Sequence, residues 1–154
     1  MAYSLLIVDD DPDFREEMKD CFFEYNVLEA RDGTEVDHLL ASPNEIDVIM
    51  LDVMLSGERG TEILRSIKDT NPDIGIIILT GHSSEEIAID ALRGNADDYL
   101  EKPVKIDILK QTVEKLLKRK AGIDKLDDLG SKGTIERIRE FLRRNYDKKV
   151  NLTD

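Results

Sequence analysis

Hydrophobic positions follow two alternating patterns over the first 120 residues. Short apolar runs indicate strands, and three of them are apolar at every position, as in strands that are buried on both faces of a sheet. The five predicted strands span residues 5–8, 26–30, 48–51, 74–79 and 98–100. Two of these runs, the second and the fifth, are short and only partly apolar. We predict strands there because each lies between two predicted helices.

After each strand, apolar residues recur at spacings of three and four, which predicts a helix with one buried stripe. The five stripes are Phe14, Met18, Cys21, Phe22 and Tyr25; Val36, Leu39 and Leu40; Ile63, Leu64 and Ile67; Ile87, Ala88, Ala91 and Leu92; and Ile106, Leu109, Val113, Leu116 and Leu117. Strand and helix alternate five times, which predicts an α/β fold with a doubly wound, flavodoxin-like, five-stranded parallel sheet.

The pattern changes after Lys120. Residues 121–133 contain three glycines, several charges and little periodicity, so we predict a linker there. Residues 134–154 show a helical stripe again and form a predicted C-terminal helical extension. The predicted organisation is therefore a domain over residues 1–120, a linker, and an extension that could be the truncated start of an output domain.

Charge and composition narrow the class of protein. The formal net charge is −12, and residues 1–120 carry 27 acidic against 14 basic side chains. Such a charge disfavours non-specific attraction to nucleic acid or anionic membranes. The sequence has no basic leader and no apolar run of membrane-spanning length, so we predict a cytoplasmic protein that does not enter a membrane. Cys21 is the sole cysteine, which excludes an intramolecular disulfide.

Polar side chains stand where the predicted strands end. The residues are Asp9, Asp10 and Asp11 after the first strand, Asp52 after the third, Thr80 after the fourth and Lys102 after the fifth. Ligands of open parallel sheets bind outside the carboxyl ends of the strands, where the strand order reverses. With the strand order 2-1-3-4-5, that point lies between the first and third strands, so we expect the carboxylates to converge.

Converging carboxylates suggest a cation, because like charges at close range resist ionisation together. Hard oxygen ligands in a small crevice suit Mg²⁺. An ionised aspartate can act as a nucleophile and form an aspartyl phosphate. The ammonium of Lys102 and the hydroxyl of Thr80 would then stabilise the phosphoryl oxygens.

Four segments together carry a resemblance to a known family. Residues 5–11, 48–55, 78–81 and 96–103 resemble the signature segments of response regulator receiver domains, and the resemblance covers residues 1–120. It implies a phosphorylation-dependent switch of a two-component system, not an enzyme with a separate substrate. The implied partner is a sensor histidine kinase, and the implied output is control of transcription.

The resemblance also implies roles for individual residues. Asp52 corresponds to the phosphoacceptor. The implied Mg²⁺ ligands are Asp9, Asp10 and Asp52 with the backbone carbonyl of Met54. Lys102 corresponds to the phosphate-contacting lysine, followed by a cis peptide bond to Pro103. Thr80 and Tyr99 correspond to the switch pair, in which the hydroxyl turns toward the phosphoryl group and the ring moves inward. The responding face would comprise the fourth helix, fifth strand and fifth helix, and it could also form a homodimer.

Some positions depart from the family pattern. Ser56 stands where a proline is usual, and Glu58 and Arg59 replace the usual Met-Asp, which we expect to alter the rigidity of the loop but not to abolish phosphorylation. Asn95 replaces the usual glycine, and asparagine tolerates a left-handed backbone. His82 lies two residues after Thr80, where a side chain can influence the attacking water or can simply be a loop histidine.

The extension resembles the opening helix and turn of an AraC-type DNA-binding domain over about 20 residues. Residues 132–149 carry seven basic and three acidic side chains, which could contact phosphates or form a solvated helix face. A helix-turn-helix needs a second helix in the major groove. We therefore expect DNA binding only through an output domain that this sequence lacks.

Three other interpretations remain open from the sequence. A haloacid-dehalogenase-like phosphatase would use Asp9 as nucleophile and Asp11 as acid, but it leaves Asp52 without a role. A calcium-binding loop would use Asp9, Asp11 and Asp13, but Phe14 and Asp20 stand where it needs Gly and Glu. A receiver-like interaction module that is never phosphorylated would be expected to lack an acidic or switch residue, and none is missing.

Overall fold

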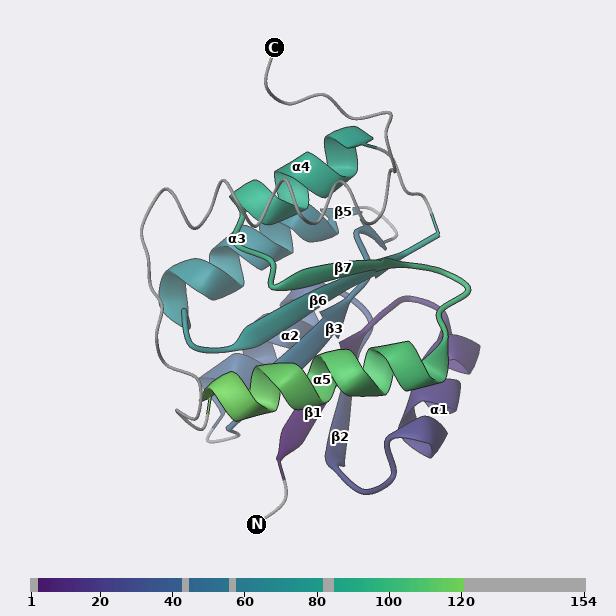
Figure 1. Cartoon of the computed structure of the whole chain (residues 1–154). Coiled ribbons are helices and arrows are strands. Elements are labelled where there is room, and N and C mark those ends of the chain that lie inside the picture. Colours follow the sequence, from purple (N-terminus) through teal and green to yellow (C-terminus); the bar gives the residue numbers. More distant parts are fainter. Residues whose placement is uncertain (1–2, 43–44, 56–57, 82–84, 121–154) are drawn as a thin grey trace.

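The central sheet has the predicted strand order. The computed structural model describes residues 3–42, 45–55, 58–81 and 85–120. Within them, five parallel strands lie in the order β2-β1-β3-β6-β7, which confirms the predicted order 2-1-3-4-5 (Figure 1). These strands are β1 (Ser4–Val8), β2 (Asn26–Ala30), β3 (Val48–Leu51), β6 (Gly75–Thr80) and β7 (Asp98–Glu101).

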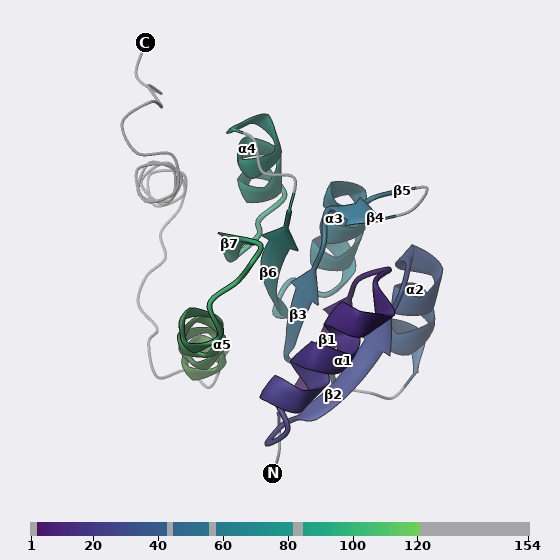
Figure 2. The same ribbon diagram turned by 90° about the vertical axis from the view of Figure 1, so that its right-hand side faces the viewer.

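Helices cover both faces of this sheet, as predicted. Figures 1 and 2 show α5 and α2 on opposite sides of the strands. One hydrophobic cluster lies under α1 and α5, and a second lies under α2, α3 and α4. The helices are α1 (Pro12–Cys21), α2 (Gly33–Ala41), α3 (Gly60–Thr70), α4 (Glu85–Arg93) and α5 (Ile106–Lys120).

Local sequence explains where α1 begins and ends. The Asp11 side chain accepts a hydrogen bond from the Asp13 N–H at 2.9 Å, and Pro12 occupies the first turn, where no N–H is needed. The helix ends at Cys21, earlier than the stripe predicts. Tyr25 therefore lies in the turn before β2, while Phe22 at the helix end is fully buried.

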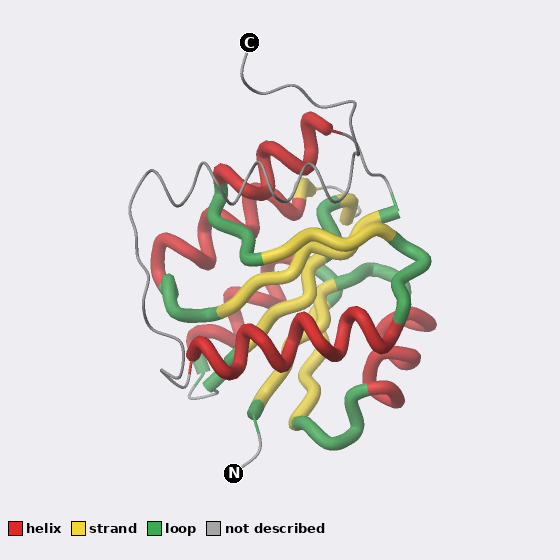
Figure 3. Tube along the Cα trace, viewed as in Figure 1, coloured by secondary structure: helices red, strands yellow, loops and turns green. Residues whose placement is uncertain are grey.

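A two-stranded antiparallel hairpin was not predicted. It pairs β4 (Met54–Leu55) with β5 (Glu58–Arg59) and lies between β3 and α3 (Figure 3). Strands of two residues are too short to show the alternation that identifies a strand in a sequence. The hairpin begins two residues after Asp52, and the N–H of its first residue, Met54, donates to Asp52 Oδ1 at 3.0 Å.

Some of the remaining predictions fall on residues that the structure describes, and others fall outside them. Asn95 has a φ of 73°, as its substitution for glycine predicted, and the Lys102–Pro103 peptide bond is cis. No helix among the described residues is long and apolar enough to cross a membrane. Ser56, His82, the linker and the helical extension lie outside the described residues, so the predictions for them stay predictions.

Candidate functional site

An acidic cluster forms where β1 and β3 end. Val8 and Leu51, the last residues of these strands, are register partners, and the Asp52 N–H donates to the Val8 carbonyl at 3.0 Å. Asp9, Asp10 and Asp52 each bring a carboxylate oxygen into one group whose atoms lie within 4.8 Å of one another. The predicted convergence is therefore confirmed for Asp9, Asp10 and Asp52, whereas Asp11 caps α1 instead.

Asp52 is nearly enclosed, with 8% of its surface exposed. Burial raises the pKa of its carboxyl group, and the neighbouring charge of Asp9 adds to the rise. The Met54 N–H, which donates to Asp52 Oδ1 at 3.0 Å, and the charge of Lys102 oppose that rise. The net pKa of Asp52 is above its ordinary value.

Lys102 supplies the positive charge of the site. Its Nζ lies 2.6 Å from Asp9 Oδ2 and 3.3 Å from Asp52 Oδ2, so the ammonium bridges the two carboxylates. Burial alone would lower the pKa of Lys102, but the hydrogen bonds and charges of Asp9 and Asp52 outweigh burial and raise it. Lys102 is therefore a cation between the carboxylates of Asp9 and Asp52, whose negative charges it offsets.

The loop that carries Asp9 is tied from two sides. Asp9 Oδ1 accepts a hydrogen bond from the Asp11 N–H at 2.9 Å. Arg15 Nη1 donates to the Asp9 carbonyl at 2.6 Å, while its Nε pairs with Glu29 Oε1 at 3.0 Å. No sequence pattern indicated Arg15, because one arginine on an otherwise polar helix face looks like any solvated charge.

Thr80 and Tyr99 lie on one face of the sheet. Tyr99 is the register partner of Ile78, which lies two residues before Thr80, so the side chains of all three point the same way. Thr80 and Tyr99 are both 0% exposed. The Lys102 N–H donates to the Thr80 carbonyl at 2.9 Å, which links the ends of β6 and β7 beside the acidic cluster.

Phe14 has a place in the site that its sequence position did not indicate. The spacing of apolar residues predicts that Phe14 lies on the buried stripe of α1, and Phe14 does pack against the cluster under α1 and α5. Its ring also lies under the Lys102 ammonium, with 4.0 Å from Nζ to the ring centroid.

The geometry does not favour the calcium-loop interpretation. Asp11 caps α1 through the Asp13 N–H, and both residues are exposed. The group that could hold a metal among the described residues joins Asp9 and Asp10 to Asp52 instead.

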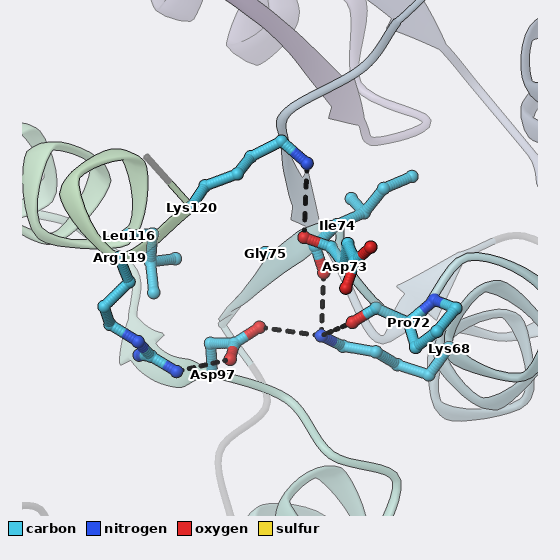
Figure 4. A pocket seen from close by; sticks show the side chains of 9 residues that line it. All are labelled: Lys68, Pro72, Asp73, Ile74, Gly75, Asp97, Leu116, Arg119 and Lys120. Carbon is cyan, nitrogen blue, oxygen red and sulfur yellow. Dashed lines mark hydrogen bonds and ion pairs between the residues drawn. The ribbon is translucent and has the colours of Figure 1, made fainter. Parts of the chain in front are cut away.

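A separate pocket of about 490 Å³ opens at the other end of the sheet, where β6 and β7 begin (Figure 4). Asp97 Oδ2 accepts from Lys68 Nζ at 3.0 Å and from the Ile76 N–H at 2.8 Å, and Asp97 Oδ1 lies 3.5 Å from Arg119 Nη2. These contacts join α3, β6 and α5 at the start of β7. We name the group Lys68, Asp97 and Arg119 the basal clasp.

Comparison with known proteins identifies the class. Residues 5–114 match the response regulator receiver domain family, so the chain belongs to that family. A receiver domain is a phosphoacceptor switch of two-component signalling and not an enzyme with a separate substrate.

Particular relatives support the same class. The chain is 36% identical over 121 residues to response regulator MprA of Mycobacterium sp. strain KMS, which covers 77% of this chain and 52% of that protein. The same identity and coverage hold for response regulator MprA of Mycobacterium tuberculosis strain H37Ra. The chain therefore spans about half the length of the curated relatives it matches.

Solved structures agree with the fold. A CheY-like receiver domain protein of Methanospirillum hungatei is 26% identical with a TM-score of 0.75, covering 80% of this chain and 100% of that chain. A receiver domain protein of Clostridium thermocellum is 31% identical with a TM-score of 0.73, covering 79% and 99%. The BeF3-activated DrrB receiver domain is 31% identical with a TM-score of 0.69, covering 77% and 99%.

Proposed function

We propose that Asp52 accepts a phosphoryl group from a sensor histidine kinase and that the chain thereby acts as a signalling switch. The observation that carries this proposal is the bridge of Lys102 between Asp9 and Asp52, inside a cluster of three carboxylates. Alone, a buried aspartate resists ionisation, but here a neighbouring cation supports the charged, nucleophilic form.

The donor set of the cluster fits Mg²⁺. Three carboxylate oxygens within 4.8 Å of one another are hard ligands in a small space, and Asp10 is exposed, which leaves room for water. Asp9, Asp10 and Asp52 with the Met54 backbone carbonyl would hold the ion. When bound, Mg²⁺ would offset the negative charge that gathers on the transferring phosphoryl oxygens.

In the proposed step, a carboxylate oxygen of Asp52 forms a bond to phosphorus. The bond to the donor breaks, and its electron pair leaves with the imidazole of a phosphohistidine or with the acetate of acetyl phosphate. Lys102 offsets charge on the phosphoryl oxygens, and the Thr80 hydroxyl donates a hydrogen bond to one of them. Both residues come from the adjacent ends of β6 and β7, so the sheet positions them together.

Thr80 and Tyr99 would transmit the change. Tyr99 is fully buried, so its ring lies inward. Phosphorylation would favour the population in which the Thr80 hydroxyl faces the phosphoryl group and the ring is inward. The face formed by α4, β7 and α5 would respond, and a homodimer through this face would be one consequence.

The output would lie outside the domain. The curated relatives are about twice as long as the matched region, and they are named response regulators. We infer that this receiver controls transcription through an output domain, which could be of the AraC type that residues 134–154 resemble, and that it acts in the cytoplasm. Those residues alone would not bind a DNA site specifically.

Acetyl phosphate tests the proposal without the kinase. The chain is incubated with acetyl phosphate and Mg²⁺, and its intact mass is measured beside an Asp52→Asn variant. We expect a gain of one phosphoryl group on the wild-type chain and none on the variant. An adduct of equal yield on Asp52→Asn, or no adduct on either chain, would contradict the proposal.

A further inference from the structure

The Lys102 ammonium has an aromatic ring on one side and carboxylates within hydrogen-bond distance. Its Nζ lies 4.0 Å from the Phe14 ring centroid, 2.6 Å from Asp9 Oδ2 and 3.3 Å from Asp52 Oδ2. The ring belongs to the first turn of α1, while Lys102 follows β7, so the contact joins segments far apart in the sequence. The Lys102 side chain is 22% exposed, so water screens this contact only in part.

The face of an aromatic ring attracts a cation through its quadrupole. This attraction differs from a hydrogen bond because it occupies no particular N–H group of the ammonium. Asp9 and Asp52 take two of the three donors that a lysine offers. A ring contact can therefore restrain Nζ while the donors turn from a carboxylate toward a phosphoryl oxygen.

Two features fix the ring itself. Pro12 and the cap formed by Asp11 set the start of α1, which places Phe14 in the first turn of the helix. The ring then packs against the buried cluster under α1 and α5. A ring held by the core has little freedom, and it restrains a lysine stem that is flexible in itself.

We propose that Phe14 is a positioning residue that holds the Lys102 ammonium in place for phosphoryl transfer to Asp52. This inference rests on the proposed function of Asp52. The proposed effect of Phe14 acts through its contact with the Lys102 ammonium. An apolar side chain at position 14 is sufficient for packing against the core. The aromatic face of Phe14 adds a second role, which is to hold the Lys102 ammonium.

Rates of phosphorylation by acetyl phosphate with Mg²⁺ test the inference. Phe14→Leu keeps an apolar side chain but removes the ring, and we expect the rate to fall about three- to tenfold. Phe14→Tyr keeps the ring face and should restore a rate within about twofold of wild type. Tyr25→Leu is the matched control, since it removes another partly buried aromatic from the same cluster at the far end of the sheet, and its rate should also stay near wild type.

A second measurement does not depend on phosphoryl transfer. An amine-reactive ester labels lysines, and peptide mass spectrometry gives the labelling rate of Lys102 relative to Lys105, which is exposed. We expect faster relative labelling of Lys102 in Phe14→Leu and wild-type labelling in Phe14→Tyr, because Phe14→Leu removes the ring face over Nζ while Phe14→Tyr keeps it.

The outcomes separate the two proposals. A wild-type rate and wild-type labelling in Phe14→Leu would overturn the role of Phe14 and leave Asp52 as the acceptor. Equal loss in Phe14→Leu and Phe14→Tyr would also overturn it, because packing would then explain the effect. If the wild-type chain gains no phosphoryl group, the proposed function fails, and the labelling of Lys102 still decides whether the ring restrains the ammonium.

Discussion

Gly60 lies so close to Asp52 that a Cβ at residue 60 would overlap the carbonyl oxygen of Asp52 and the Cα of Val53. The Gly60 N–H also donates to the Val53 carbonyl at 2.8 Å. The first residue of α3 is thus packed directly on the backbone that carries the proposed phosphoacceptor. The neighbours are backbone atoms and not the flexible end of a side chain, so no rotamer change can relieve the overlap.

Gly60→Ala should therefore destabilise the domain and displace Asp52. We expect the free energy of unfolding to fall by about 1–3 kcal/mol, the usual cost of forcing extra atoms into a packed interior. Urea denaturation measures this, and the rate of phosphorylation should fall with it. Gly81→Ala is the control for stability, because a Cβ there meets nothing within 4 Å. If Gly60→Ala and wild type unfold at the same urea concentration, the close packing of Gly60 on the Asp52 backbone does not limit the residue at position 60.

Arg15→Met should weaken Mg²⁺ binding without removing a ligand. Arg15 holds the Asp9 carbonyl at 2.6 Å, and groups that orient metal ligands affect metal affinity by about tenfold or more. We expect the Mg²⁺ concentration that gives half the maximal rate of phosphorylation to rise about tenfold or more.

Lys19→Met provides the comparison for Arg15. Lys19 pairs with Glu29 Oε2 at 3.1 Å, as Arg15 pairs with Oε1, but within the described part of the chain no ion pair or hydrogen bond joins Lys19 to Asp9. The Mg²⁺ dependence of Lys19→Met should match wild type. If both variants shift by the same factor, surface charge and not the Asp9 contact is responsible.

Asp97→Ala should lower stability by breaking the basal clasp. The side chains of Lys68 and Asp97 are 11% and 10% exposed, and removing one partner of such a pair leaves an uncompensated charge. We expect a loss of about 3–5 kcal/mol in the free energy of unfolding. Asp73→Ala is the control, since Asp73 is exposed and Lys120 contacts its backbone carbonyl, which the substitution keeps.

The basal clasp and the acidic cluster lie at opposite ends of the sheet. Below the temperature at which it unfolds, Asp97→Ala should therefore still accept a phosphoryl group at a rate near wild type. A rate loss as large as that of a substitution in the acidic cluster would show that the two ends are coupled.

The acidic cluster was predictable from the sequence because its position depends on the topology of the sheet. Asp9 and Asp52 each follow a fully apolar strand, and the order of parallel strands brings their carboxyl ends together whatever the side-chain details. The positions of Lys102 and Thr80 beside the cluster were predictable for the same reason, because each lies at the carboxyl end of a parallel strand. Asn95 was also predictable, since a non-glycine residue with positive φ is most readily an asparagine.

The supporting contacts were not predictable from the same pattern. Whether Phe14 or Arg15 reaches the site depends on how far α1 is rotated and where each side chain points, and hydrophobic spacing does not fix either. Asp97 looks like a loop aspartate because its partners, Lys68 and Arg119, come from helices distant in sequence. The pairing of β4 with β5 depends on so few residues that no periodicity marks it.

The identity of the acceptor residue is the most direct test. The chain is phosphorylated with acetyl phosphate and Mg²⁺, and the acyl phosphate is reduced with borohydride, which converts the modified aspartate to homoserine. Peptide sequencing by mass spectrometry then locates the homoserine. We predict it at position 52; homoserine at position 9, as a phosphatase using Asp9 would give, or at neither position, would contradict the account.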